Sequence, residues 1–443
     1  MKKSAIWRPV VAGLGIGISL IGTAKTFGAT IVWDAGGGAD KKWSTAVNWV
    51  GDVIPVTGDT ASLNGNSGTI AIYDSTVLAA NQSVAQVTVG TGSGGFGNFS
   101  ITGGTLTVDN AFIVGGNGPG TVNHSAGTLN VDAVTGRFRI ANNALAGGSQ
   151  YNLSGGALNI KNEWFIGLGS TVSGVVTGVS GTLLQTGGSL TNVSGVNPAE
   201  LRLGNLAGAT GTYTLQGGTA TLGNIGIGYT TGSTGNLNLQ GTTGGTLTAN
   251  IIKKQVAGST ANFNFSKGTL NVADLQFAPT SWTGGTMNAT LASATITNNG
   301  GTLSPGGNGT VGNTLFGSTF DYTQTSIGVL AIDIATLASF DTVTMNLTNG
   351  DAVLNGSLDI NLLAGPAPFG SYDVLSASTI STTGLTLTGN STGFTYAVVA
   401  GPGSSQILRL TAAAIPEPNA PVLGLMSGML MVFGRRHGAR HGT

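Results

Sequence analysis

Short runs in which apolar and polar residues alternate fill the chain from about residue 97 to residue 301. A typical unit runs from Asn98 to Val108, where two such runs flank Gly103-Gly104. Alternation with a period of two predicts half-buried β-strands, and glycine suits a tight turn that needs a positive φ. The region contains no run of helical period. The pattern therefore predicts an all-β fold of many short strands.

The unit recurs at a spacing of 23, 29, 32 and 30 residues, measured between the last glycines of successive turns: Gly104, Gly127, Gly156, Gly188 and Gly218. A third short strand that ends in Ile/Leu-x-Gly or a close variant often follows, as at 112–115, 165–167, 201–204 and 225–228. Such a period is typical of solenoids, because one coil cannot bury its apolar residues alone. We therefore expect a parallel β-helix or related β-solenoid over 97–301. A two-sheet sandwich of hairpins stays open, since Gly-Gly between alternating strands is also a hairpin signal.

The segments on either side of the repeats differ from them. Residues 30–96 carry Trp33, Trp43 and Trp49, which we interpret as an atypical N-terminal cap over the open end of the core. The alternative is an exposed surface on which tryptophans stack against carbohydrate. Residues 302–411 have fewer Gly-Gly turns and more carboxylates. They predict a C-terminal β domain that is either sandwich-like or a continuation of the solenoid.

The N-terminal residues have the organisation of a secretory signal peptide. Lys2 and Lys3 precede an apolar stretch from Val10 to Gly22, and small residues follow. We assign 1–29 to the signal peptide and leave open whether cleavage follows Ala24 or Ala29. This assignment predicts export through the Sec translocon.

The C-terminal residues 412–443 form a three-part tail. A Pro-Glu-Pro motif lies at 415–418, an apolar segment of 15 residues at 420–434, and a basic end at 435–443. The apolar segment is short against the roughly 20 residues of a spanning helix. The arginines of the basic end would hold it on the cytoplasmic side of a membrane; they are Arg435, Arg436 and Arg440. We expect a transmembrane sorting tail here, with a permanent membrane anchor as the alternative.

Composition removes several classes of function. Charged residues are 8% of the chain, the formal net charge is zero, and there is no cysteine. The chain therefore has no disulfide framework and no basic field of the kind that attracts nucleic acid. Hydrophobic residues at 40% argue against disorder, which combines low hydrophobicity with high charge.

Candidate catalytic groups are few. Residues 97–301 hold five carboxylates, no two closer than 23 residues: Asp109, Asp132, Glu163, Glu200 and Asp274. Asp109 and Asp132 occupy the same position of successive repeats, so we interpret them as repeated turn residues, with a catalytic pair across neighbouring coils as the alternative. His124 is expected at a surface-facing polar position, and no Cys/His cluster suggests zinc. We expect no catalytic site, no cofactor and no metal.

Two resemblances extend this picture. The order of Pro416-Glu417-Pro418, apolar segment and basic end resembles the bacterial PEP-CTERM signal. The stretch from Trp33-Asp34 to Gly58-Asp59 and the Ser/Gln-Gly-Gly-Thr-Leu repeats resemble autotransporter-associated β-strand repeat proteins of bacterial surfaces. The first resemblance implies recognition of Pro416, Glu417 and Pro418 by an exosortase-like membrane peptidase, with transient residence in the inner membrane. A true autotransporter ends in a membrane β-barrel, whereas this chain ends in one apolar segment, so the sorting tail takes that place.

Together these patterns favour an exported, non-enzymatic structural or adhesive protein of the cell envelope, cell surface or extracellular matrix. Exopolysaccharide is a candidate ligand for its arrays of small polar side chains. The alternatives are a β-helix polysaccharide lyase or hydrolase and a permanently membrane-anchored adhesin.

Overall fold

The computed structural model describes residues 28–64, 70–75, 82–92, 95–132, 137–172, 175–193, 199–366 and 368–413. Residues 1–27 of the expected signal peptide lie outside the described residues. So does nearly all of the tail, including Pro416, Glu417, Pro418, Arg435, Arg436 and Arg440. The described residues are almost entirely β-structure, with one short 3-10 helix, η1 (Ala46–Asn48).

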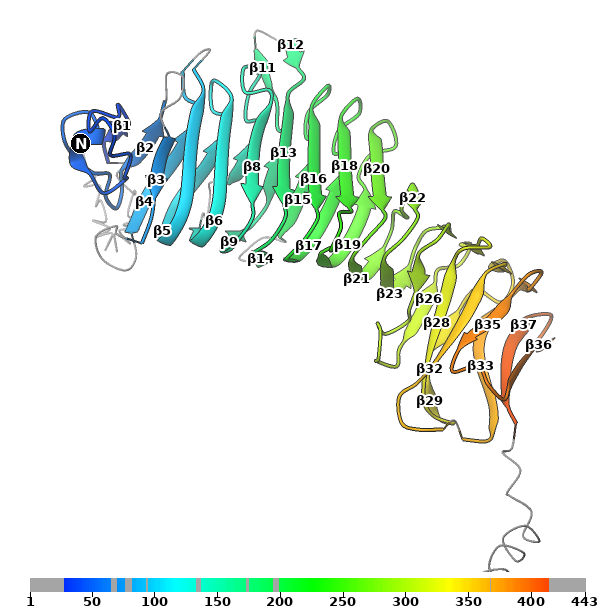
Figure 1. Cartoon of the computed structure of the whole chain (residues 1–443). Helices are drawn as coiled ribbons and strands as arrows, with labels where there is room; N and C mark the ends of the chain where they lie inside the picture. The colour runs from blue at the N-terminus through cyan, green and yellow to red at the C-terminus, as the bar shows by residue number, and fades with distance from the viewer. Residues whose placement is uncertain are drawn as a thin grey trace, which may run out of the picture.

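The strands stack side by side from β1 at the N-terminal end to β36 and β37 at the other end (Figure 1), and they pair in three ladders. The first ladder consists of β3 (Ile70–Tyr73), the starts of β5 (Gly97–Val114) and β6 (Gly120–Val131), β8 (Ser149–Leu153), β13 (Ser180–Gln185), β16 (Thr210–Leu215), β18 (Thr234–Leu239), β20 (Thr260–Phe265) and β22 (Ser281–Trp282). A separate sheet of β24 (Ile296–Asn298), β27 (Tyr322–Gln324), β31 (Asp351–Leu354) and β34 (Thr379–Ser381) follows it.

The second ladder follows the glycine turn of each coil. It consists of the start of β4 (Gln82–Val89), the later parts of β5 and β6, β9 (Ala157–Lys161), β14 (Ser189–Val193), the starts of β17 (Thr219–Ile227), β19 (Thr246–Lys254), β21 (Thr269–Leu275) and β23 (Thr286–Ala292), then β25 (Thr302–Leu303), β28 (Val329–Thr336), β32 (Ser357–Leu362) and β35 (Thr386–Gly389).

The third ladder closes each coil. It consists of β1 (Thr30–Val32), β2 (Thr60–Leu63), the ends of β4 and β5, β7 (Phe138–Ile140), β10 (Trp164–Ile166), β15 (Glu200–Leu203), the ends of β17, β19, β21 and β23, then β26 (Asn313–Phe316), β30 (Thr342–Thr344) and β33 (Gly370–Ala377). The strands Ile/Leu-x-Gly picked out from the sequence lie in this ladder.

The pairing confirms the predicted β-solenoid, which has about 12 turns. Leu183 of β13 pairs in parallel with Tyr151 of β8 on one side and with Tyr213 of β16 on the other. Neighbours in the ladder are therefore one coil apart in sequence. A sandwich of antiparallel hairpins over this region is wrong, because hairpins would pair the strands that flank each Gly-Gly turn.

Glycine is required at the corner between the first and second ladders. Gly127 has φ 81°, and a Cβ there would lie 2.6 Å from the carbonyl oxygen of Gly104 in the preceding coil. An L side chain would meet both a strained backbone conformation and a direct overlap. The close approach of successive coils thus explains why the Gly-Gly turn is repeated.

The core is a continuous column of inward-facing side chains. Leu237 and Leu239 of β18 are 0% and 1% exposed, and their neighbours in the ladder are equally buried. Aromatic rings stack across coils, as Phe112 does on Phe138 with centroids 5.6 Å apart. Because equivalent positions stack from coil to coil, the apolar residues of the alternating pattern form a single hydrophobic core.

The expectation that His124 faces the surface is wrong. Its side chain is 1% exposed, and its Nδ1 lies 2.8 Å from the hydroxyl oxygen of Tyr151 in the next coil. Burial lowers the pKa of His124, while its contacts with the turn carbonyls of Gly127 and Ala126 oppose this. Alternation places position 124 on the same side as the buried Val122, and the tyrosine partner makes a buried imidazole tolerable.

The tryptophans of the N-terminal segment are core residues. Trp33, Trp43 and Trp49 are 2%, 0% and 0% exposed, and their rings meet edge to face at 4.7–5.1 Å. Trp43 also packs on Tyr73 of the first full coil, with centroids 5.7 Å apart. These rings are part of the core, and they are not an exposed stacking surface. Parallel pairing nevertheless begins as early as β1 and β2.

The C-terminal region continues the solenoid. β28, β32 and β35 extend the second ladder in parallel register. Among the named strands of the described ranges, antiparallel pairing occurs in local hairpins and at the end, where β33, β37 (Gln406–Ala412) and β36 (Phe394–Ala400) form a closing sheet. The other hairpins are β11 (Ser170–Val172) with β12 (Val175–Thr177) and β28 with β29 (Ser339–Phe340). Within the described residues, no helix has the length and apolar character needed to span a membrane.

Candidate functional site on the outer face of the third ladder

Several outward-facing charged and aromatic side chains lie on the third ladder. One row of this face consists of residues in mutual register: Ser62, Thr88, Ile113, Arg139, Phe165, Arg202, Gly226 and Lys253. Neighbours in a row are about 4.8 Å apart, the spacing of paired strands. A hydroxyl-bearing half and a charged half therefore form one continuous strip.

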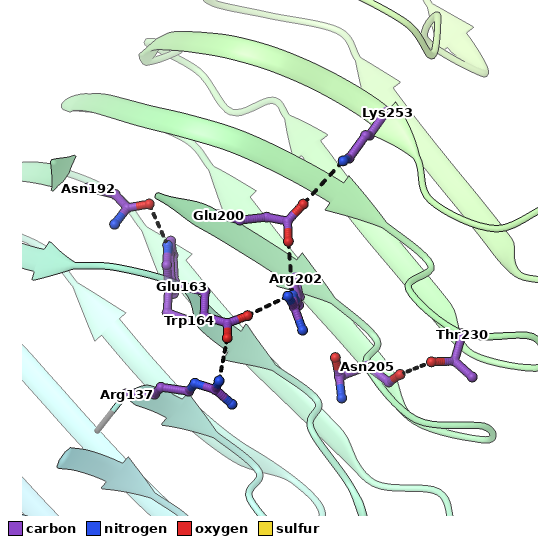
Figure 2. Close-up of polar contacts among 9 residues, drawn as sticks. All are labelled: Arg137, Glu163, Trp164, Asn192, Glu200, Arg202, Asn205, Thr230 and Lys253. Atoms are coloured by element: carbon purple, nitrogen blue, oxygen red, sulfur yellow. Dashed lines mark hydrogen bonds and ion pairs between the residues drawn. The ribbon is translucent and has the colours of Figure 1, made fainter. Parts of the chain in front are cut away.

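The charged half is a network of ion pairs, which we call the charge cluster: Arg137, Glu163, Glu200, Arg202 and Lys253 (Figure 2). Glu163 binds Arg137 on one side and Arg202 on the other, where Nη2 of Arg202 lies 2.5 Å from Oε2. Nε of Arg202 lies 2.9 Å from Oε2 of Glu200, and Nζ of Lys253 lies 3.3 Å from Oε1 of Glu200. Each carboxylate thus bridges cations from different coils.

Two aromatic rings lie under the charge cluster. Phe165 points outward, yet it is only 1% exposed, because the guanidinium carbons of Arg137 and Arg202 lie 5.0 and 5.3 Å from its ring centroid. Arg202 also lies 3.9 Å from the ring centroid of Tyr229. Cation–π contacts of this kind contribute about 0.5–2 kcal/mol each. The charge cluster therefore stabilises the stacking of coils, since it covers an outward phenylalanine.

Polar contacts at the edges of the charge cluster hold β10 and the loop after β15 in place (Figure 2). Nε1 of Trp164 donates to Oδ1 of Asn192 at 3.2 Å, and Nδ2 of Asn192 donates to the carbonyl oxygen of Ile160 at 3.0 Å. The hydroxyl of Thr230 donates to the carbonyl oxygen of Asn205. The Oδ1 atom of Asn205 is buried and has no hydrogen-bond donor among the described residues.

The uncharged half of the face is hollowed. This hollow has a volume of about 290 Å³ and is lined mainly by hydroxyl and amide side chains: Thr30, Thr60, Ser62, Gln86, Thr88, Thr91, Ile113, Gly116, Asn117 and Asn142. Gln86 donates to the hydroxyl of Thr88 at 2.9 Å, and Ser62 donates to Thr91 at 3.1 Å. Such a lining offers donors and acceptors of the kind that bind sugar hydroxyls.

Arg139 lies where the two halves meet. It is next to Ile113 in the row, and its Nη1 donates to Oδ1 of Asn142 at 3.1 Å. Its Nε is buried without an acceptor, and it forms no ion pair with any residue that the structure describes. Burial and the neighbouring Arg137 lower the pKa of this guanidinium.

Of the five carboxylates considered from the sequence, Glu163 and Glu200 belong to the charge cluster, whereas Asp109 and Asp132 lie elsewhere. Val108 pairs with Val131, so Asp109 and Asp132 follow on adjacent coils, as their repeat positions predicted. Asp109 accepts a hydrogen bond from Ser83 at 2.8 Å, and Asp132 forms an ion pair with Lys161 at 2.7 Å. Asp109 lies within β5 and Asp132 directly after β6, and each is held by a side chain of a neighbouring coil. Over the ranges that the structure describes, no three His, Cys, Asp or Glu side chains form a group that could hold a metal ion.

The sequence did not predict the charge cluster. Its members lie up to 116 residues apart, from Arg137 to Lys253, and only the ladder register brings them together. The sequence nevertheless contained a signal for this contact. One strand motif occurs in two copies, Phe165-Ile166-Gly167 and Leu201-Arg202-Leu203-Gly204. Aligned on their glycines, they place Phe165 beside Arg202, as the structure does.

The chain matches none of the family models against which it was compared, and no curated protein matches it.

Proposed function

We propose that this protein is an exported, non-enzymatic structural or adhesive component of the cell surface or extracellular matrix, sorted through its tail by an exosortase-like peptidase. The observation that carries the proposal is the pairing of a three-part sorting tail with a β-solenoid. Residues 415–443 hold the motif, the apolar segment and the basic end in the order of a sorting signal. A rigid stack of about 12 turns is suited to displaying a long polar surface away from a membrane.

The outer side chains support a binding or scaffolding role. Asparagines repeat at equivalent outward positions and bond from coil to coil, as Nδ2 of Asn262 does to Oδ1 of Asn236 at 2.8 Å. The charge cluster uses both of its carboxylates, Glu163 and Glu200, in ion pairs. A glycosidase would instead present two carboxyl groups to its substrate. These arrangements favour a scaffold over the lyase or hydrolase alternative.

The test is the intact mass of the protein recovered from the envelope and the medium of its native host. A C-terminus between Pro416 and Pro418 is expected if the tail is removed as a sorting signal. A mass that retains Arg435 and Arg436 would instead identify a permanently anchored adhesin and overturn the sorting proposal.

A variant pair sharpens this test. Glu417→Ala should block processing while the solenoid stays folded, and Asn419→Ala, just outside the motif, serves as the matched control. Release of both variants at the wild-type rate would contradict a role for the Pro-Glu-Pro motif.

A further inference from the structure

Arg139 is the one arginine of the third-ladder face that forms no ion pair within the described residues. Arg137 and Arg202 on the same face are both held by Glu163. Arg139 has one hydrogen-bond acceptor, Asn142, and its buried Nε has none among the described residues. The half-buried Arg139 therefore carries a positive charge that no ion pair with a described residue compensates, and an anion at the accessible part of its guanidinium would gain a charge-assisted hydrogen bond.

The hollow beside Arg139 suits a sugar ring. Ile113 lines it and lies next to Arg139 in the row, and Asn142 both lines the hollow and accepts the hydrogen bond from Arg139. Its lining is otherwise hydroxyl and amide groups with Ile113 as an apolar patch. A volume of about 290 Å³ lies at the lower end of small-ligand sites, roughly 300–1,000 Å³.

The charge of the face extends this site along the solenoid. Arg137, Arg139, Arg202 and Lys253 are four cations on this face, against three carboxylates: Glu163, Glu200 and Asp274, which lies in the row of Glu200. The face is therefore positive by one charge in a chain with no net charge. Arg139 and Lys253 are four strand steps apart in the row, or about 19 Å at the usual strand spacing. A polyanion lying along the ladder would reach both ends.

We propose that this face binds an acidic polysaccharide, with a uronate sugar ring in the hollow and its carboxylate at Arg139. The planar guanidinium fork matches a carboxylate, and the hollow supplies partners for the ring hydroxyls. The proposal rests on the surface or matrix role proposed above and names its ligand class. Sorting and binding are measured separately, so the failure of one is distinguishable from the failure of the other.

The experiment is a titration of the purified full chain into labelled hexamers of galacturonate, glucuronate or mannuronate, with fluorescence anisotropy as the readout. A neutral galactose hexamer and a single-stranded DNA hexamer serve as comparison ligands. We expect at least one uronate hexamer to bind, with an affinity that falls as salt is raised. No binding of any uronate, or equal binding of the neutral sugar or the DNA, would overturn the proposal.

Variants locate the site. Arg139→Gln should weaken uronate binding about tenfold or more, the effect of losing a charge-assisted contact. Lys267→Gln removes the same charge at an exposed position outside the third ladder and should bind as the wild type does. Arg139→Lys keeps the charge but lacks the planar fork, so its affinity for uronate should lie between those of Arg139→Gln and the wild type. Circular dichroism checks that each variant is folded, and unchanged binding by folded Arg139→Gln would refute the assignment.

Discussion

Asp341 should make the C-terminal coils lose stability as pH rises. Its side chain is fully buried, Oδ1 accepts from the backbone N–H of Gly312 at 2.7 Å, and Oδ2 accepts from that of Asp333 at 2.9 Å. Burial, with a smaller contribution from the nearby carboxylate of Asp333, raises the pKa of Asp341 to about 7 against the opposing effect of these two donors. The group therefore prefers to be neutral in the folded state.

The direction and the size of this pH effect on the free energy of unfolding follow from proton linkage. Below about pH 3.8 the folded and unfolded states both carry the proton, so Asp341 adds no pH dependence there. Between that pH and about 7 only the folded state retains the proton, and the free energy of unfolding falls as pH rises. A difference of about three pKa units corresponds to about 4 kcal/mol, because one unit is 1.36 kcal/mol. Above about pH 7 the loss is complete.

Hydrogen exchange with mass spectrometry measures this locally, which suits a long repeat array that need not unfold in one step. Peptides from β28 and β30, corrected for intrinsic exchange, should lose protection between pH 5 and 7, while peptides from β18 provide the internal reference. Asp341→Asn should abolish the difference in slope, although its amide can satisfy only one of the two N–H donors. Wild-type protection of β28 and β30 that is flat or rises over this range would refute the reasoning.

Three further perturbations test how the coils are held together. Leu237→Ala deletes a fully buried side chain and should cost about 2–5 kcal/mol, measured by chemical denaturation. Gln185→Leu removes the acceptor of the Tyr213 hydroxyl, now 2.7 Å from Oε1, and should cost about 1–3 kcal/mol. Adding Tyr213→Phe should recover only part of this cost, because Nε2 of Gln185 also donates to the carbonyl oxygen of Thr219 at 3.0 Å. Gly211→Ala places a Cβ 2.0 Å from a backbone oxygen of the neighbouring coil and should lower the melting temperature, whereas Gly147→Ala, with nothing within 4 Å, should not. Equal melting temperatures for the two glycine variants would contradict the close approach of the coils.

The sequence predicted the ladders because each coil carries the same local signals. The alternation in Asn98 to Val108 and the positive-φ glycine at its turn are properties of a short segment, and they recur wherever a coil repeats. The continuation into 302–411 was left open, since fewer Gly-Gly turns weaken that signal. Pairing of β28 with β32 shows that parallel stacking needs the strand pattern and not the glycine pair.

Burial of polar groups was decided only by the tertiary structure. His124 and Gln185 look like surface residues in the sequence, yet both are buried because a tyrosine of the next coil supplies a hydrogen-bond partner. The tertiary structure likewise decided which residues contact the charge cluster and Arg139. Their neighbours come from other coils, at separations that vary from coil to coil, so no local pattern encodes which charges meet.

The sequence by itself therefore determined the all-β class and the position of the glycine corners, because these depend on periodicity within a coil. It favoured the solenoid, and the parallel pairing of the coils decided against the hairpin sandwich. The tertiary structure alone decided which side chains share the third-ladder face, where Phe165 lies beneath Arg202 and Arg139 borders the hollow. Loop lengths between coils set the register of each strand on the next. A contact between coils is thus fixed by the sum of those loops and by packing of the shared core, which act only once the chain has folded.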